Sequence, residues 1–355
     1  MRYHHANTGL TSDLSTAELN EATTPQVAYV EPPSDFDKLA PDEASSIWTE
    51  LSPLLQSHKL WLDGTEEYEK KPPPPMKDPE DPFCVKDDEN HLVFAPGIKR
   101  RRVFSYRILS PTHRISIDQF GRMVHIRAVH KNDIHLEALK RLSVAHPLNR
   151  VVPVLSLIRL QEWVLICQPY WGKFWYFRDE ITHVQLWRIT LDLLEGLVFM
   201  HEWGVSHGDI HQGNILYNHS DIGPRQTDPI FRVGYIDFGS AFVFPIDATD
   251  HTVTHAMAQT TPPSGIKAPE QSLNEGSWDA YAADVYNLGA ILKEEIAGED
   301  FTLLDDMIAQ MTPEDPSKRI TAKEALNMIQ NALTKDQEAC EALGLVNKAS
   351  ASVQP

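Results

Sequence analysis

The sequence predicts an α+β protein of two lobes, a small β-rich lobe followed by a larger helical lobe. Short runs with the two-residue periodicity of strands dominate residues 103–170, and helical periodicity dominates residues 171–334. Strands first and helices second is the order typical of an α+β plan. The chain has 355 residues, 42% of them hydrophobic, which is enough for a sizeable core.

The sequence of residues 1–102 predicts an extension that precedes the two lobes in the chain. Residues 1–42 are polar and without clear periodicity, which predicts a disordered tail. Residues 43–102 combine a short helix with a linker rich in Pro and acidic residues. We expect Trp48 to dock that helix onto the main domain, and Pro53 to weaken the helix or end it early. The helix is indicated by apolar residues on one face: Ile47, Trp48, Leu51, Leu54 and Leu55.

The first lobe, residues 103–170, is predicted to contain five strands and one helix. The helix is expected around Leu136, Leu139 and Leu142, which share one helical face. The strands are expected at residues 103–109, 115–118, 123–129, 151–157 and 163–167.

The second lobe, residues 171–334, is predicted to begin with a long helix that runs from Thr182 to His201. Thr182 and Gln185 have the spacing of a capping box, which predicts where this helix starts. The rest of the lobe is mainly helical, with loops at 219–229 and 240–267, and residues 335–355 are expected to form a C-terminal tail.

The composition excludes several classes of function. A formal net charge of −18 argues against a nucleic-acid binder, because neutralising phosphates needs a basic surface. No apolar run has the length of a membrane span, and the N-terminus lacks the apolar core of a signal peptide. Three widely spaced cysteines predict reduced thiols. We therefore expect an intracellular, cytoplasmic protein, with a nuclear location left open by the basic run at residues 99–102.

Two short segments carry the strongest indication of function. The first is the run His-Gly-Asp-Ile-His-Gln-Gly-Asn at residues 207–214, and the second is the Asp-Phe-Gly turn at residues 237–239. Asp209, Asn214 and Asp237 supply two carboxylates and a carboxamide, which phosphoryl transfer from a metal-bound nucleotide requires. One acid orients the attacking hydroxyl and accepts its proton, while the other acid and the Asn hold magnesium. The alternative is that these side chains only cap their own turns.

These segments resemble the protein kinase-like superfamily, and three later motifs follow in the expected order. Ala268-Pro269-Glu270 resembles the motif that closes the activation segment. Residues 284–289 resemble the start of the large buried helix of the second lobe, and residues 315–319 the segment whose Arg pairs with that Glu. The layout also resembles kinase-like proteins of fungi, through residues 199–201 and the Trp48 segment. The resemblance implies a two-lobed protein kinase-like fold that uses ATP and Mg²⁺.

The resemblance also implies roles for the matching residues. Glu270 and Arg319 are expected to form a structural ion pair, and Asp284 is expected to cap backbone groups. The implied site residues of the second lobe are Asp209 as catalytic base, His211 near the transferred phosphate, and Asn214 and Asp237 as magnesium ligands.

The first lobe departs further from the resemblance. Arg127 stands where a Lys is expected to hold the nucleotide phosphates, with Glu137 on the following helix as its partner. Arg keeps the charge, but it is longer and planar. Strand alternation puts His125 on the same face as Arg127, where we expect it to crowd the nucleotide base. The loop at residues 110–114 contains no Gly, so we expect weaker contact with the phosphates.

Three further positions are expected beside the nucleotide. They are Cys167 as the gatekeeper, and Gln168 and Tyr170 in the hinge. The alternatives are a plain core thiol for Cys167, a solvated helix face for Glu137 and a surface strand position for Arg127.

The loop at residues 207–214 has two departures of its own. Gly208 replaces the usual Arg before the catalytic Asp, and His211 replaces a Lys. This version resembles the loop of small-molecule phosphotransferases such as aminoglycoside and choline kinases. Without the Arg, the cation that would bind a phosphorylated activation segment is missing, so we expect activity that does not depend on that phosphate.

Three functions remain open at the level of the sequence. The first is ATP-dependent phosphoryl transfer to Ser or Thr hydroxyls of a protein substrate. The alternative is a pseudokinase that keeps the fold and binds a protein partner, which the changes in the first lobe favour. A small-molecule kinase is disfavoured by the segment from Ala268 to Arg319, because that segment builds a peptide-binding platform in the resembled family.

Overall fold

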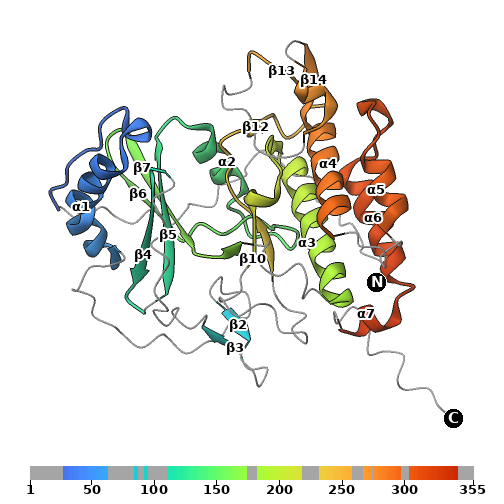
Figure 1. The fold of residues 1–355 in the computed structure, drawn as a ribbon, viewed down its shortest axis with the longest axis horizontal. Helices are drawn as coiled ribbons and strands as arrows, with labels where there is room; N and C mark the ends of the chain where they lie inside the picture. The colour runs from blue at the N-terminus through green and yellow to red at the C-terminus, as the bar shows by residue number, and fades with distance from the viewer. Residues whose placement is uncertain are drawn as a thin grey trace.

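The computed structural model describes residues 27–62, 84–86, 92–94, 110–120, 122–173, 182–217, 232–257, 267–273, 276–296 and 304–342. A curled sheet in the N-terminal part lies beside an array of helices in the C-terminal part (Figure 1). This arrangement confirms the predicted α+β, protein kinase-like architecture. Among the described helices, none has both the length and the apolar character needed to cross a membrane.

The main sheet has five antiparallel strands in the order β1-β4-β5-β7-β6. Four of them lie in the predicted first lobe, and the strand expected at residues 103–109 lies outside the described residues. The edge strand comes instead from the extension, where Leu60 pairs with Asp118 and Leu62 with Ser116. The bounds are β1 Leu60–Leu62, β4 His113–Asp118, β5 Met123–His130, β6 Ser156–Arg159 and β7 Trp163–Pro169.

The strand predicted at residues 151–157 is wrong in its position. β6 begins only at Ser156, and the preceding residues pair with another part of the chain. Val152 N donates to the carbonyl of Tyr235 at 3.0 Å, and Tyr235 N donates to that of Arg150 at 2.8 Å. Pro153 follows and has no N–H to donate, so the chain leaves this pairing before it joins the main sheet.

The extension folds against the outer face of the sheet through helix α1 (Pro41–Ser57) (Figure 1). The helix continues through Pro53, so the prediction that this residue ends it early is wrong. Pro53 has no N–H to donate to the carbonyl of Thr49, four residues earlier. Both residues face solvent, so water can bond this carbonyl instead. The prediction of disorder is wrong for residues 27–42, because the 3-10 turn η1 (Phe36–Lys38) buries Phe36 completely.

Trp48 anchors the extension, as predicted. Its side chain is 1% exposed, and its Nε1 donates to the carbonyl of Pro111 at 2.7 Å. Its ring lies 5.9 Å from that of Phe36, and the Arg114 guanidinium lies over it at 5.4 Å. Residues 36–62 are therefore an integral part of the first lobe.

Two helices begin at side-chain caps. α2 (Ile134–Leu142) is capped by Asp133, whose carboxylate accepts from His135 N at 2.8 Å. α3 (His183–Glu202) begins at the predicted capping box: Gln185 N donates to Thr182 Oγ1 at 3.3 Å, and Thr182 N to Gln185 Oε1 at 2.8 Å. α3 lies at the centre of the second lobe, in contact with α4 (Ala280–Ile291), α6 (Ala322–Leu333) and α7 (Gln337–Ala342).

Short elements connect these helices and carry the loops of interest. α7 lies within the expected C-terminal tail and is preceded by Asp336, which accepts a hydrogen bond from Trp187 Nε1 at 2.9 Å. The remaining elements are β2 Cys84–Lys86, β3 Leu92–Phe94, β8 Gly172–Lys173, β9 Val205–Ser206, η3 Gln212–Asn214, β10 Ile215–Tyr217, β11 Val233–Tyr235, β12 Phe242–Val243, β13 Thr252–Thr254, η4 Pro269–Ser272, β14 Ser277–Asp279, the π-helical turn η5 Leu292–Ile296, α5 Asp305–Met311 and η7 Pro316–Lys318.

Candidate active site

The loop between β9 and β10, hereafter the catalytic loop (residues 206–214), is fixed from below by Asp284. This carboxylate is fully buried at the start of α4. It accepts hydrogen bonds from Ser206 Oγ and His207 N at 2.8 Å, and from Gly208 N at 2.9 Å. The predicted backbone-capping role of Asp284 is thereby confirmed.

His207 ties the catalytic loop to the turn that follows β11. Its Nε2 donates to the carbonyl of Ile236 at 2.9 Å, and its Nδ1 accepts from Asp209 N at 3.3 Å. These roles require the neutral ring, and burial accordingly lowers the pKa of His207. The buried His207 side chain thus sets the distance between Asp209 and Ile236, the residue before Asp237.

Gly208 is required by the backbone. Its φ is +76°, in the left-handed region, and a Cβ built there would lie 2.1 Å from the carbonyl oxygen of Ser240. Only Gly fits this position. The usual Arg is therefore excluded by the path of the loop.

The structure brings three of the predicted residues together on the catalytic loop. Asn214 Nδ2 donates to the carbonyl of Asp209 at 3.0 Å and lies 3.4 Å from its Oδ2. His211 Nε2 is 3.6 Å from the same Oδ2. The carbonyl of Asn214 accepts from Ile236 N at 3.0 Å, which places Asp237 on the neighbouring chain segment.

Asp237 has a constrained backbone and a partly exposed carboxylate. Its φ is +62°, and its Oδ1 accepts from Gly239 N at 3.2 Å and from Arg127 Nη1 at 2.6 Å. Burial alone would raise the pKa of Asp237, but the charge and hydrogen bond of Arg127 hold that pKa well below its usual range. The side chain stays 39% exposed, so solvent and ions reach it.

The predicted pairing of Arg127 with Glu137 is wrong. Glu137 is exposed and makes no ion pair with any residue that the structure describes. Positions 135 and 137 lie about 200° apart around a helix, so they face opposite sides. The site-facing residue of α2 is His135, which is 2% exposed and whose Nδ1 accepts from Phe238 N at 3.1 Å.

Sequence reasoning missed His135, although a signal was present. His135 continues the apolar face of Leu139 and Leu142 at helical spacing, whereas Glu137 does not. The same Nδ1 lies 3.7 Å from Asp237 Oδ1, and the ring meets Phe238 edge-on at 6.1 Å. α2 therefore contacts the Asp-Phe-Gly turn through an imidazole.

Cys167 does not lie on the site face of the sheet, so the gatekeeper prediction is wrong. In the β5–β7 register Arg127 pairs with Ile166, and Cys167 pairs with Ile126. Paired residues share a face, and Cys167 packs in the cluster around Trp48. Burial raises the pKa of its thiol to about 12, which fits the alternative of a core thiol.

The hinge residues lie at the end of β7. Gln168 pairs with His125, on the same face as Arg127, and its Nε2 donates to the carbonyl of Val152 at 2.8 Å. Tyr170 N donates to the carbonyl of Met123 at 3.0 Å.

A pair of histidines lines the sheet beside Arg127. His125 lies on the same face as Arg127, as expected, and its Nε2 is 3.1 Å from Nδ1 of His113, a residue that sequence reasoning missed. Burial, with the charge of Arg127, lowers the pKa of His113 to about 3 and that of His125 to about 4. Both rings are therefore neutral near pH 7.

The donor set fits a magnesium nucleotide. Asn214 uses its amide nitrogen on Asp209, which leaves the amide oxygen, the ligating atom, for a cation. Asp237 adds a carboxylate, and Mg²⁺ prefers such oxygen ligands, with phosphates and water completing its shell. Within the described ranges no cluster of three or more His, Cys, Asp or Glu forms a metal site.

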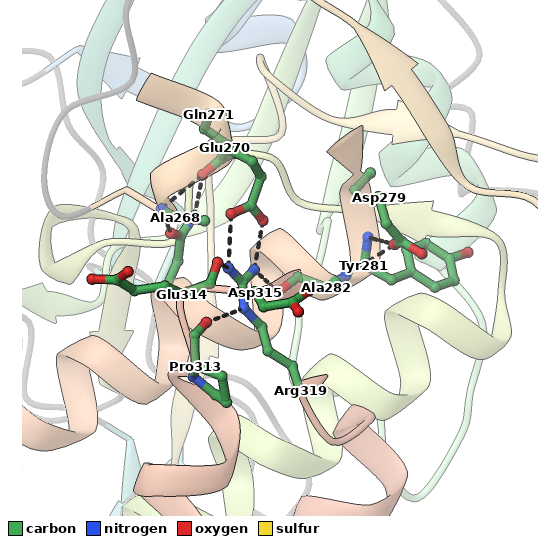
Figure 2. A network of polar contacts seen from close by, with 12 residues as sticks. Ala268, Glu270, Gln271, Asp279, Tyr281, Ala282, Pro313, Glu314, Asp315 and Arg319 are labelled. Carbon is green, nitrogen blue, oxygen red and sulfur yellow. Dashed lines mark hydrogen bonds and ion pairs between the residues drawn. The ribbon is translucent and has the colours of Figure 1, made fainter. Parts of the chain in front are cut away.

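Behind the site, Glu270 and Arg319 form the predicted structural ion pair (Figure 2). The two guanidinium nitrogens lie 2.5 Å and 2.7 Å from the two carboxylate oxygens. Arg319 also donates to the carbonyls of Pro313, Ala282 and Glu314, and its side chain is fully buried. This pair joins the segment closed by Glu270 to the helices of the second lobe.

Comparison with known proteins points in the same direction. No protein-family model matches the chain. It is 28% identical to MAP kinase kinase kinase wis4 of Schizosaccharomyces pombe, over 42% of this chain and 11% of the relative. It is 25% identical to a membrane-associated tyrosine- and threonine-specific cdc2-inhibitory kinase of Drosophila melanogaster, over 58% of this chain and 38% of the relative.

A third relative, CTD kinase subunit alpha of Schizosaccharomyces pombe, is 24% identical over 59% of this chain and 37% of its own length. The chain thus spans less than half of the length of each of these relatives. Each of these relatives is named as a kinase, in agreement with the predicted resemblance. The chain therefore resembles the protein kinase-like superfamily in fold and, at low identity, in sequence.

Proposed function

We propose that the protein transfers a phosphoryl group from ATP, with Mg²⁺, to Ser or Thr hydroxyls of a protein substrate. The observation that carries the proposal is the hydrogen bonding of Asp209 to Asn214 in a loop held by Asp284 and His207. That arrangement keeps the base and one metal ligand in a fixed relation. The relatives, which are named as protein kinases, support the general class of reaction.

Each site residue has a role in this proposal. Asp209 orients the attacking hydroxyl and accepts its proton, and Asn214 and Asp237 hold the metal. Mg²⁺ bound there would neutralise charge on the nucleotide phosphates. His211 lies beside Asp209 as a ring whose pKa is lowered by burial, so it acts by hydrogen bonding more than by charge. Arg127 supplies the cation of the first lobe.

The proposal is tested with the purified protein, γ-labelled ATP, Mg²⁺ and a library of Ser- and Thr-containing peptides. We expect transfer that Asp209→Asn reduces by at least about a hundredfold, because general-base catalysis contributes that much or more. Binding of Mg·ATP should stay nearly intact in this variant. The rise in melting temperature with Mg·ATP measures that binding. Equal transfer by Asp209→Asn would assign the activity to a contaminant or to another base.

A second candidate is a pseudokinase, and one observation favours it. Arg127 already neutralises Asp237 at 2.6 Å, while Glu137, which would otherwise hold the guanidinium, points away. A metal ligand engaged in this way binds Mg²⁺ less readily. This candidate predicts that ATP raises the melting temperature as much in EDTA as with Mg²⁺, and that no phosphate is transferred.

Arg127→Lys separates the two candidates further. A shorter, compact ammonium leaves Asp237 more available to a metal. In a working but limited enzyme we expect faster transfer by this variant. In a pseudokinase the variant changes the Mg²⁺ dependence of ATP binding and yields no transfer.

A further inference from the structure

A stack of three rings joins the segment after the Asp-Phe-Gly turn to the second lobe. The rings of His251 and Tyr281 lie 3.8 Å apart at 17°, and those of Tyr281 and His201 lie 3.9 Å apart at 3°. Tyr281 is therefore held between two imidazoles. His251 precedes β13, Tyr281 opens α4 and His201 lies near the end of α3, so three separate parts of the chain meet here.

The stack leads directly to the catalytic loop. Tyr281 Oη donates to the carbonyl of His201 at 3.0 Å, and His201 Nε2 lies 3.2 Å from Asp284 Oδ2. The same carboxylate accepts the backbone N–H groups of His207 and Gly208. The His201 ring is thus one of the partners of Asp284, the residue that fixes the catalytic loop.

The other end of the stack is fixed to the segment. His251 Nε2 lies 3.1 Å from the carbonyl of Ala248, and the carbonyl of His251 accepts from Ala280 N at 3.1 Å. Phe244 meets the His251 and Tyr281 rings edge-on, at 5.3 Å and 5.7 Å. His251 is therefore placed by contacts on both sides.

Tyr281 itself has a fixed backbone. Its N–H donates to Asp279 Oδ1 at 2.8 Å, as does that of Ala282 at 3.0 Å (Figure 2). β13 pairs with β14 just before this turn, with Thr252 opposite Asp279. The stack therefore rests on a capped helix start, which limits how far the Tyr281 ring can move.

The ring stack is one of the connections between this segment and the catalytic loop. Gly208 provides no cation for a phosphate on the segment, and its backbone admits no larger side chain. Thr252 and Thr254 are exposed on β13, which pairs with β14 through its backbone. The ring contacts connect this segment to the loop together with the pairing of β12 and β9, in which Phe242 lies opposite Ser206.

We propose that Tyr281, clamped between His251 and His201, is a positioning residue that couples the segment at residues 242–254 to the catalytic loop. The loop is held ready for phosphoryl transfer by these rings, without a phosphate on the segment. This inference rests on the proposed function, because it assigns the loop a catalytic task. It is decided by a measurement that does not require turnover.

The test is amide hydrogen exchange at His207 and Gly208, whose N–H groups bond Asp284. It compares the full chain with Tyr281→Leu, Tyr281→Phe and His251→Ala. We expect Tyr281→Leu and His251→Ala to speed exchange at both amides about tenfold, since local opening follows the lost contacts. Tyr281→Phe keeps the stack and should restore most of the protection. The affinity for Mg·ATP should change less than about twofold, since the stack touches no nucleotide ligand.

The matched control is His255→Ala. His255 follows β13 as His251 precedes it, but its ring contacts Trp278 at 4.7 Å instead of Tyr281. It should leave exchange at His207 and Gly208 unchanged. Equal exchange at these amides in His255→Ala and His251→Ala, or unchanged exchange in Tyr281→Leu, overturns the proposal.

Measuring phosphoryl transfer gives a second, separate test. Phosphatase treatment of the wild type should leave any phosphoryl transfer unchanged, and loss of transfer after treatment contradicts the inference. If the wild type transfers no phosphate under any condition, the proposed function fails, while amide exchange still decides whether the rings position the loop.

Discussion

His113 and His125 are two neutral imidazoles that lie near the charged side chains of Arg127 and Asp237. His113 lies opposite Arg127 on β4 and His125 lies beside it on β5, and His135 and Asp237 also act on both rings. Burial lowers the pKa of His113 to about 3 and that of His125 to about 4. In the unfolded chain a histidine has a pKa of about 6.5. Protonation of either ring therefore opposes folding.

This difference predicts acid sensitivity. Between pH 6.5 and about pH 4 the unfolded chain binds more protons than the folded one, so stability falls as the pH falls through that window. Each such histidine lowers the free energy of unfolding by up to about 1.4 kcal/mol for each pH unit within this window. We expect His113→Asn to flatten the slope, measured by urea unfolding at pH 7, 5.5 and 4.5. His130→Asn, at a partly exposed position, serves as the control, and a wild type with constant stability over this range would contradict the prediction.

Gly208 predicts a second effect at the scale of one residue. Gly208→Ala adds a Cβ that meets the Ser240 carbonyl oxygen at 2.1 Å, in a left-handed backbone. We expect a loss of more than about 1 kcal/mol in the free energy of unfolding. Gly276→Ala is the matched control, because its φ is +110° and nothing lies within 4 Å of the added atom. Equal losses in the two variants would show that the contact with Ser240 is unimportant.

Among the elements, helix α1 contributes most to the outer face of the sheet. Trp48→Ala should cost about 3–5 kcal/mol, the usual range for removing a large buried aromatic residue. Trp48→Phe keeps much of the packing and loses the hydrogen bond to Pro111, so its cost should be smaller. Thermal and urea unfolding measure both. Thr49→Ala, on the exposed side of the same helix, should be near neutral.

Elements were predictable from the sequence where the signal was local. β5, α2 and α3 follow from periodicity and capping, and the Thr182 capping box marks the start of α3 correctly. β1 was not predictable, because it has only three residues and pairs with a strand about fifty residues later. In the site, Asp209 and Asn214 lie on a local turn whose geometry its own sequence determines, and Asp284 lies in helix α4.

The first-lobe part of the site was not predictable, because it depends on which face each residue occupies. Cys167 lies one residue from Ile166, which pairs with Arg127, and this one-residue difference places Cys167 on the far face of the sheet. Glu137 lies two residues from His135, and this difference turns Glu137 away from Arg127. Only the pairing of β5 with β7, and the packing of α2, decide these faces. The register of β5 and β7 is not encoded in any short stretch of residues, whereas the buried face of α2 is indicated by the helical spacing of His135, Leu139 and Leu142.

At the scale of the molecule, the N-terminal and C-terminal parts share one hydrophobic core cluster, which includes Leu136 and Phe238, and a few polar contacts also join them. Arg127 reaches Asp237, His135 reaches Phe238, and Arg141 donates to the carbonyl of Phe244. Each contact joins the sheet or α2 to the segment after β11. The position of that segment therefore depends on both parts of the chain.

The Glu270–Arg319 pair predicts how the second lobe responds to a broken contact. Arg319→Met leaves a buried carboxylate unpaired, so we expect a loss of about 3–5 kcal/mol. Lys318→Met is the control, because this lysine is 73% exposed and its pair with Asp315 lies at the surface. Chemical denaturation of both variants measures the difference. Similar stability of the two would mean that the buried pair is replaceable.

The pairing of β1 with β4 has a consequence for any shortened version of this protein. A fragment that begins at residue 103 would lack both the strand that completes the sheet and the helix that shields its outer face. The open backbone of β4 and the bare apolar surface around Ile126 and Leu165 would then attract other copies. Such a fragment should self-associate and precipitate, although it would contain every motif by which the superfamily is identified.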